Sequence, residues 1–264
     1  MTTDLLDAFG RSPASAGLFL DFDGVLSDIA PEPDAAVIRP GMAELMVELS
    51  EQLGRVAVIS GRPVDYLHSM VPEQIDIVGL YGLEWRSGGE HRTLREAEPY
   101  RAAVRELVDA AAASFGADVV EPKGLSLTIH YRSDPDLAPR MRDWVIEHGK
   151  RTGLDHRPAK RSYELHPPIK RDKGTALVEL AEDLDPVAYV GDDLGDLPAF
   201  DGLDELATQG ATTLRVAVDS AEAPPILRSR ADLVVDGPAG AEALLRRILQ
   251  AALSGPSTGD ETGL

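Results

Sequence analysis

The feature that most constrains the fold is a short apolar run that ends in two carboxylates and a glycine. Residues 18–26 read Leu-Phe-Leu-Asp-Phe-Asp-Gly-Val-Leu, which places acids at Asp21 and Asp23. An apolar run bounded by a turn is typical of a buried parallel strand, and open α/β sheets bind ligands at the carboxyl ends of such strands. Two carboxylates this close repel each other unless they meet a cation, share a proton or take part in a reaction. The segment therefore predicts a functional site, although a polar turn would explain this segment alone.

A second apolar run, at residues 56–59, is followed by Ser60, Gly61 and Arg62. A serine hydroxyl and a glycine amide are donors that can approach a phosphate oxygen closely. The plainer interpretation is a serine that caps the next helix. The run predicts a second strand that ends at the same site.

Two later segments add a cation and a dense group of acids. Lys173 opens the amphipathic stretch 176–184, and a lysine at a helix start opposes the helix dipole, which favours a nearby anion. The apolar run 187–190 is followed by a glycine and three acids, Asp192, Asp193 and Asp196. Carboxylates this dense suit a hard cation, and oxygen ligands favour magnesium over zinc. A solvated lysine and an acidic loop are the competing interpretations.

In order and in type, these four groups resemble the motifs of the haloacid dehalogenase (HAD) superfamily of aspartate-nucleophile phosphotransferases. The resemblance covers about residues 15–100 and 169–250. It implies a Rossmann-like core, a doubly wound parallel sheet. It also implies that Asp21 is the nucleophile, that Asp23 is the general acid and base, and that Lys173 is a catalytic residue. Lys173 would bind the phosphate together with Ser60, Gly61 and Arg62. A Mg²⁺ site would be formed by Asp21, the Asp23 carbonyl, Asp192, Asp193 and Asp196.

The chemistry follows from the residues themselves. A phosphate monoester dianion repels an incoming carboxylate, so Mg²⁺ and Lys173 must neutralise the phosphoryl oxygens before Asp21 attacks. Attack gives an aspartyl phosphate, and Asp23 can protonate the leaving oxygen and then activate water. Superfamily members that keep their aspartyl phosphate have another residue two positions after the nucleophile. Asp23 therefore favours hydrolysis.

The segment between the second and third motifs does not continue the parallel pattern. It predicts an inserted α+β cap with the order αββαββ, with helices near 99–115 and 135–151 and strands near 118–121, 125–131, 155–158 and 162–166. We expect a core at 1–100 and 169–253, a cap at 101–168 and a flexible tail at 254–264. A cap over the core strands would exclude water and select the leaving group.

Segments of the cap and core resemble trehalose-6-phosphate phosphatases. The similarity lies in residues 80–85, 122–132 and 163–167, and it implies that Lys123, Glu164 and Glu84 bind substrate. This chain departs from the family pattern at three positions. Gly195 and Leu197 stand where the family usually has threonine and glutamate, and Val25 stands where it usually has threonine. The predicted substrate is trehalose 6-phosphate. Sucrose 6-phosphate and mannosyl- or glucosyl-3-phosphoglycerate stay open as alternatives.

Composition restricts the partners. With 45 acids against 26 bases, the net charge is −19, which repels nucleic acids and anionic membranes. Cysteine is absent, so a disulfide or thiolate site is excluded, and the N-terminus lacks the pattern of a signal peptide. We expect a monomeric cytoplasmic enzyme whose only partner is a small sugar phosphate.

Two other classes of protein share part of this pattern. A receiver domain also forms an aspartyl phosphate with acids, magnesium and a lysine, but it is about half this length and has no cap. A catalytically dead sugar-phosphate sensor on the same fold should have lost the nucleophile or a metal acid, and this chain retains both. Turnover with magnesium, against binding without turnover, separates the sensor from the enzyme.

Overall fold

The computed structural model describes residues 2–29, 35–159, 161–221 and 223–255. These residues form two compact units, one made of Met1–His91 with Arg171–Leu264 and the other of Arg92–Lys170. The second unit begins at Arg92 and ends at Lys170, and Tyr100 packs against its core. The boundaries expected from the sequence, 101 and 168, stay a prediction. The predicted tail falls almost entirely outside the described residues.

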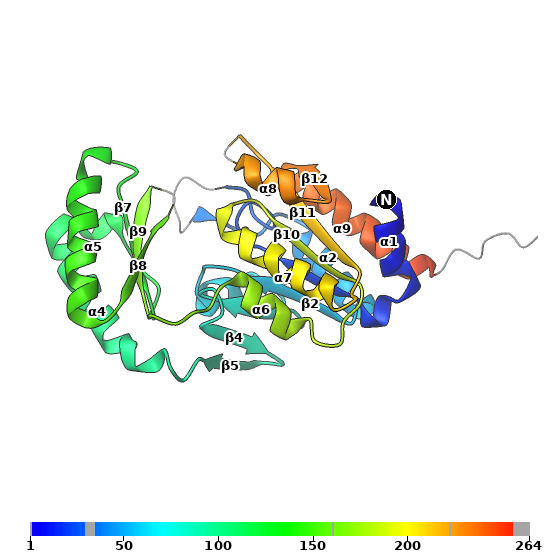
Figure 1. Cartoon of the computed structure of the whole chain (residues 1–264), viewed down its shortest axis with the longest axis horizontal. Helices are drawn as coiled ribbons and strands as arrows, with labels where there is room; N and C mark the ends of the chain where they lie inside the picture. Colours follow the sequence, from blue (N-terminus) through cyan, green and yellow to red (C-terminus); the bar gives the residue numbers. More distant parts are fainter. Residues whose placement is uncertain (1, 30–34, 160, 222, 256–264) are drawn as a thin grey trace, which may run out of the picture. The chain divides into compact units, whose positions relative to one another are not determined.

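The first unit is built on a sheet of eight strands in the order β12-β11-β10-β1-β2-β3-β4-β5 (Figure 1). From β12 to β3 every neighbouring pair is parallel. The strands are β1 Gly17–Leu20, β2 Arg55–Ile59, β3 Asp76–Gly79, β4 Glu84–Ser87, β5 Glu90–Thr93, β10 Val187–Gly191, β11 Thr213–Asp219 and β12 Leu233–Asp236. β1 lies between β2 and β10, so Asp21 follows a fully buried central strand.

Helices cover both faces of this sheet because side chains alternate along each strand. In β1, Leu18 and Leu20 pack into one apolar core, and Phe19 packs into the other. The first core takes side chains from α1 Thr2–Arg11, α2 Met42–Gln52, α3 Val64–His68 and α9 Gly237–Ser254. The second takes them from α6 Lys173–Leu180, α7 Leu197–Thr208 and α8 Pro225–Arg230. The doubly wound α/β fold is thereby confirmed.

The strands β4 and β5 were not predicted. β4 pairs with β3 in the antiparallel direction and extends the sheet at its edge. Both are four residues long and β5 is largely exposed, so their sequence carries little of the apolar signal that marks buried strands. The helix α2 begins at Met42, directly after Gly41, which has φ 80° and is its N-cap.

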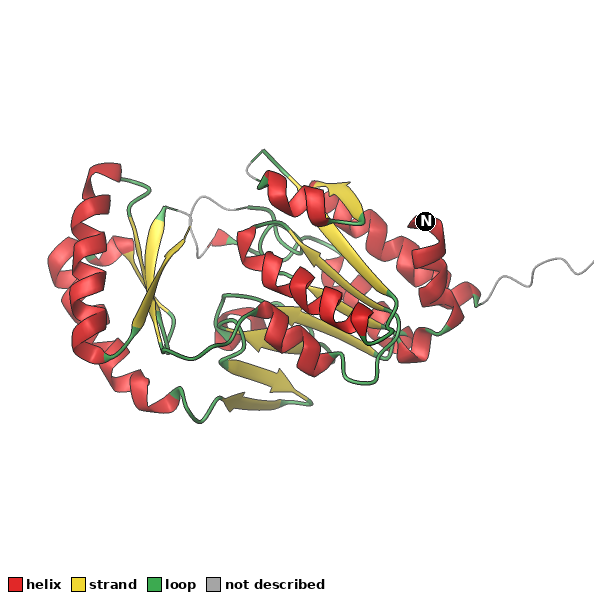
Figure 2. Ribbon diagram, viewed as in Figure 1, coloured by secondary structure: helices red, strands yellow, loops and turns green. Residues whose placement is uncertain are grey.

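The second unit has the predicted order of helices and strands. Its strands form one sheet in the order β6-β7-β9-β8, antiparallel throughout. The two helices supply side chains to a single core, and Figure 2 shows them on one face of this sheet. The elements are α4 Arg101–Phe115, β6 Val120–Pro122, β7 Leu127–His130, α5 Ala138–Thr152, β8 Asp155–Ala159 and β9 Ser162–His166.

Short 3-10 helices join several of these elements. They are η1 Pro13–Ser15, η3 Glu98–Tyr100, η4 Ala117–Val119, η5 Pro135–Leu137 and η6 Leu194–Asp196. In the described part of the chain, no helix has the length and apolar character needed to cross a bilayer.

Candidate active site

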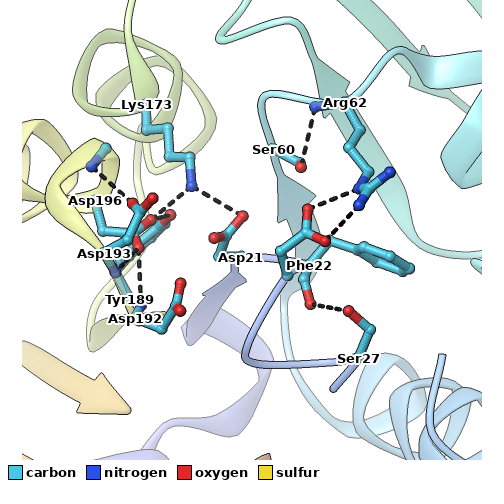
Figure 3. Close-up of polar contacts among 12 residues, drawn as sticks. Asp21, Phe22, Ser27, Ser60, Arg62, Lys173, Tyr189, Asp192, Asp193 and Asp196 are labelled. Carbon is cyan, nitrogen blue, oxygen red and sulfur yellow. Dashed lines mark hydrogen bonds and ion pairs between the residues drawn. The ribbon is translucent and has the colours of Figure 1, made fainter. Parts of the chain in front are cut away.

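The predicted motifs of the first unit meet at the carboxyl ends of three adjacent strands. Asp21 follows β1, Ser60 follows β2 and Asp192 follows β10. The Asp21 amide donates a hydrogen bond of 2.9 Å to the Val190 carbonyl, which ties the end of β1 to the end of β10. Figure 3 shows Ser60 and Arg62 on one side of Asp21 and the acidic loop on the other.

Lys173 supplies the positive charge of this cluster. It is the first residue of α6, where Asp172 caps the helix by accepting a hydrogen bond from the Thr175 amide. Its Nζ atom lies 2.9 Å from Asp21 Oδ1 and 2.6 Å from Asp196 Oδ1. The side chain is almost fully buried, so these two carboxylates stabilise its charge in the absence of water.

Asp196 holds the acidic loop together. Its Oδ1 atom accepts hydrogen bonds of 2.6 Å from both Lys173 and the Tyr189 hydroxyl. Its Oδ2 atom accepts from the amides of Asp192 and Asp193, at 2.8 Å and 3.0 Å. Four donors therefore fix this carboxylate in place. Tyr189 was not predicted as a site residue, because it lies in the apolar strand β10 and its ring is typical of a core residue. Its hydroxyl is the only polar side-chain group of that strand and was the available signal.

Burial and mutual repulsion shift the proton affinities of the cluster. Burial raises the pKa of Asp192 to about 8, with further increases from Asp196 and Asp193. Burial also raises the pKa of Asp21 well above its usual value, although Lys173 opposes this. For Lys173, burial lowers the pKa, but Asp196 and Asp21 outweigh it and leave the pKa well above its usual value. The site is thus short of positive charge.

The residues of the cluster fit a divalent cation. Asp21, Asp192 and Asp196 each offer one carboxylate oxygen, and these three oxygens lie within 4.8 Å of one another. Three ionised carboxylates beside one ammonium carry a net charge of −2, which one divalent ion neutralises. All the donors are hard oxygen atoms, as magnesium prefers. Because Asp196 already accepts four hydrogen bonds, Asp21 and Asp192 are the better candidates to bind the ion directly.

The other two predicted metal residues lie differently. Asp193 is exposed and caps η6, with its Oδ1 atom accepting a hydrogen bond of 2.7 Å from the Gly195 amide. The Asp23 carboxylate pairs with Arg62, through Nε–Oδ2 and Nη2–Oδ1 distances of 2.7 Å each. The role of the Asp23 carbonyl as a ligand stays a prediction.

The pair of Arg62 and Asp23 was not foreseen, because the sequence suggested that Arg62 binds phosphate. The guanidinium also lies 4.3 Å from the centre of the Tyr66 ring, which favours this orientation. Two donors of the guanidinium, Nε and Nη2, thus face the Asp23 carboxylate (Figure 3). This geometry points to a role of Arg62 in holding Asp23.

Ser60 and Gly61 lie where the phosphate cradle was predicted. Ser60 is buried, and its Oγ atom accepts a hydrogen bond of 3.2 Å from the Arg62 amide. A hydroxyl that accepts one bond can still donate its own hydrogen. Nearby, Gly24 adopts φ 71°, and a Cβ atom added there would lie 2.3 Å from Asp192 Oδ2. The glycine after Asp23 therefore leaves room for the acidic loop.

Glu84 lies in β4 of the first unit and is buried. One of its oxygens accepts a hydrogen bond of 3.1 Å from the Val64 amide at the start of α3. This bond gives the carboxylate a structural role as a helix cap. Substrate binding by Glu84 stays a prediction.

Lys123 and Glu164 lie in the second unit. Glu164 is buried in β9 and accepts hydrogen bonds of 2.8 Å from both Ser126 and Arg157. Burial acts to raise the pKa of Glu164, but Lys123 and Arg157 outweigh it and lower the pKa. Lys123 and Glu164 therefore belong to one charge network, in which Lys123 and Arg157 stabilise the negative charge of Glu164.

Known proteins resemble this chain in sequence and in fold. The sequence profile described as Trehalose-phosphatase matches residues 19–234. A probable trehalose-phosphate phosphatase of Sinorhizobium fredii is 34% identical over 60% of this chain, and the trehalose-phosphate phosphatase of Mycobacterium ulcerans is 32% identical over 76%. A crystal structure titled trehalose-6-phosphate phosphatase related protein superposes with a TM-score of 0.76 at 21% identity. It covers 90% of this chain and 99% of that one.

The curated relatives are longer than the part that this chain matches. The matched region spans 64% of the Sinorhizobium protein and 55% of the Mycobacterium ulcerans protein. The structural likeness, at 21% identity, supports the fold.

We predict that Mg²⁺ stabilises the protein and does so more strongly as the pH rises. A carboxyl whose pKa is raised to about 8 binds its proton more tightly in the folded state, so metal-free stability should fall between about pH 4 and 8. Saturation at 100 times the dissociation constant should add about 2.7 kcal/mol. Thermal unfolding with chelator and with Mg²⁺, at several pH values, measures both effects.

Asp192→Asn provides the decisive comparison for this prediction. It removes one buried charge, so the metal-free variant should unfold at a temperature no lower than the wild type and respond weakly to Mg²⁺. Asp109→Asn, on the exposed face of α4, is the matched control and should respond as the wild type does. An equal Mg²⁺ response in wild type and Asp192→Asn would rule out this cluster as the metal site.

Proposed function

Because this chain belongs to the trehalose-phosphatase family, we propose that it hydrolyses trehalose 6-phosphate to trehalose and inorganic phosphate. The observation that carries the proposal is the buried Asp21 carboxylate at the end of β1, which lies 2.9 Å from the Lys173 ammonium. A carboxylate beside a buried cation can approach a phosphate dianion that would otherwise repel it.

In the first step, an oxygen of Asp21 forms a bond to phosphorus and the bond from phosphorus to the sugar oxygen breaks. Lys173 stabilises the charge on the phosphoryl oxygens, while Ser60 and the Gly61 amide donate hydrogen bonds to them. Asp23 gives its proton to the departing sugar oxygen. The products of this step are trehalose and an aspartyl phosphate on Asp21.

In the second step, water attacks phosphorus and the bond to Asp21 breaks, which releases phosphate. Asp23 now takes the proton of the water, so one residue serves both steps. When bound by Asp21 and Asp192, Mg²⁺ would neutralise negative charge on the phosphoryl group. The pairing with Arg62 would hold Asp23 in reach and keep its carboxylate oriented between the steps.

The second unit supplies the specificity in this proposal. The register of its sheet places Thr128 opposite both Glu121 and Glu164, and Glu164 opposite Arg157, so these polar side chains form one row on one face. Leu127 and Ile129 alternate with Thr128 and pack into the core with the helices. A row of mixed donors and acceptors suits the hydroxyl groups of a disaccharide.

The first prediction from this mechanism concerns the nucleophile. Asp21→Asn should abolish turnover by several orders of magnitude, because an amide is too weak a nucleophile to form the phosphoenzyme. Phosphate release from trehalose 6-phosphate measures the loss, and circular dichroism checks the fold. Substantial turnover by this variant would contradict the mechanism.

The second prediction separates the two roles of Arg62. If Arg62 holds Asp23, Arg62→Ala should reduce kcat/KM for trehalose 6-phosphate roughly 10- to 100-fold, within the range of lost acid catalysis. It should reduce kcat/KM for 4-nitrophenyl phosphate much less, because that leaving group departs without a proton. Steady-state kinetics with both substrates measures the difference.

A double-mutant cycle tests whether Arg62 acts through Asp23. Asp23→Asn should show the same dependence on the leaving group, and adding Arg62→Ala to it should cause little further loss. Arg62→Lys, which keeps the charge but not the fork, should fall between alanine and wild type. Equal losses on both substrates would instead support the phosphate contact that the sequence suggested.

The third prediction concerns the substrate. The wild type should hydrolyse trehalose 6-phosphate far faster than glucose 6-phosphate, because contacts to the remote sugar align the phosphoryl group. Lys123→Ala and Glu164→Gln should lose most of this preference and leave hydrolysis of 4-nitrophenyl phosphate nearly unchanged. Kinetics on a panel of sugar phosphates provides the comparison.

Lys150→Ala, at an exposed position on α5, is the matched control and should behave as the wild type does. Glutamine is chosen at position 164 because it keeps the volume of a buried side chain. Faster hydrolysis of sucrose 6-phosphate or a glycosyl phosphoglycerate would overturn the substrate but keep the phosphatase.

A further inference from the structure

Two consecutive residues after β3 adopt a backbone conformation that side chains rarely accept. Leu80 has φ 49° and Tyr81 has φ 57°, both in the left-handed region, and neither is glycine. Such residues persist only where the surrounding structure enforces them, and they cluster at functional sites. The turn at Leu80 and Tyr81 is therefore a place to look for function.

Hydrogen bonds to the predicted phosphate loop hold this turn. The Leu80 amide donates to the Arg62 carbonyl at 3.0 Å, and the Tyr81 amide donates to the Ser60 carbonyl at 3.1 Å. The Gly82 amide closes the turn by donating to the Gly79 carbonyl at 3.0 Å. The position of Tyr81 is thus fixed directly against the loop that follows β2.

The Tyr81 side chain fills the space that Gly61 leaves open. A Cβ atom added at Gly61 would lie 2.5 Å from both Cζ and the hydroxyl oxygen of Tyr81. Gly61 does not have a positive φ, so its backbone conformation alone does not require glycine. The glycine is needed for space, and the group that occupies this space is a phenol.

The same ring also reaches the acidic loop. A Cβ atom added at Gly195 would lie 3.9 Å from Cε1 of Tyr81. Gly61 follows β2 and Gly195 follows β10, and β1 lies between these two strands in the sheet. The Tyr81 ring thus approaches the loops that follow both strands flanking β1, and Asp21 follows β1.

We propose that the Tyr81 hydroxyl donates a hydrogen bond to the phosphoryl group as Asp21 attacks it, as a further phosphate-binding residue. The inference rests on the proposed phosphatase function and deepens it. The hydroxyl lies against the Ser60–Gly61 loop, and the strained turn holds it there before substrate arrives. A donor that is held in place spends no free energy on reorientation during the reaction.

Tyr81→Phe tests this inference, because it removes the hydroxyl and keeps the ring that packs against Gly61. A lost hydrogen bond to a charged group should lower kcat/KM roughly 10- to 100-fold. The loss should be equal for trehalose 6-phosphate and 4-nitrophenyl phosphate, because the phosphoryl group is common to both. The temperature of unfolding should change little.

Binding of inorganic phosphate gives a readout that does not depend on turnover. Calorimetry in the presence of Mg²⁺ should show weaker binding of phosphate to Tyr81→Phe than to the wild type. Tyr100→Phe removes a hydroxyl from a half-buried tyrosine of the second unit and is the matched control. It should leave both kinetics and phosphate binding unchanged.

Each contrary result has a defined meaning. Unchanged kinetics and phosphate binding in Tyr81→Phe would overturn the inference and leave the ring with a packing role only. A loss confined to trehalose 6-phosphate would also overturn it, because the hydroxyl would then serve the sugar. If the wild type hydrolyses neither substrate, the proposed function fails, and phosphate binding alone decides whether Tyr81 holds the anion.

Discussion

The ion pairs of the Lys173 ammonium with Asp21 and Asp196 are the interaction on which the candidate active site depends. An uncompensated buried charge is strongly destabilising, and these contacts give the buried ammonium two carboxylate partners. The contact joins three separate elements, because Asp21 follows β1, Lys173 opens α6 and Asp196 ends η6. The Tyr189 hydroxyl, in β10, donates a further hydrogen bond to Asp196. Residues in or next to two strands and two helices thus meet at the Lys173 ammonium.

The second unit compensates a buried acid in the opposite way. Burial raises the pKa of Asp192, and the neighbouring acids raise it further. Burial acts in the same direction on Glu164, but Lys123 and Arg157 outweigh it and lower the pKa. A site of the first kind attracts a cation, and a site of the second kind is already neutralised and can offer hydrogen bonds to an uncharged ligand. The proposed function assigns the chemistry to the first unit and sugar recognition to the second, and the charge around Asp192 and Glu164 differs in the sense that this proposal expects.

The sequence predicted the strands that carry the site because their apolar runs are continuous and end at chemically unusual residues. It predicted the order of elements in the second unit for a similar reason, since the periodicity changes between strand and helix. It could not reveal that Arg62 faces Asp23, or that Tyr81 lies over Gly61. Both contacts depend on which strands are neighbours in the sheet, because Asp23 follows β1, Gly61 and Arg62 follow β2, and Tyr81 follows β3.

The pairing of β1 has a consequence for how the chain folds. Gly17 pairs with Arg55 of β2 on one side and with Val187 of β10 on the other, and the whole second unit lies between these partners in the sequence. During synthesis, one edge of β1 therefore has no partner strand for its backbone N–H and C=O groups until β10 has been made. Contacts so distant in sequence slow folding, and an unpaired strand edge invites association with other chains. The second unit has its own core, so once it is folded it leaves fewer flexible residues between β1 and β10 and lowers the entropic cost of bringing the two strands together.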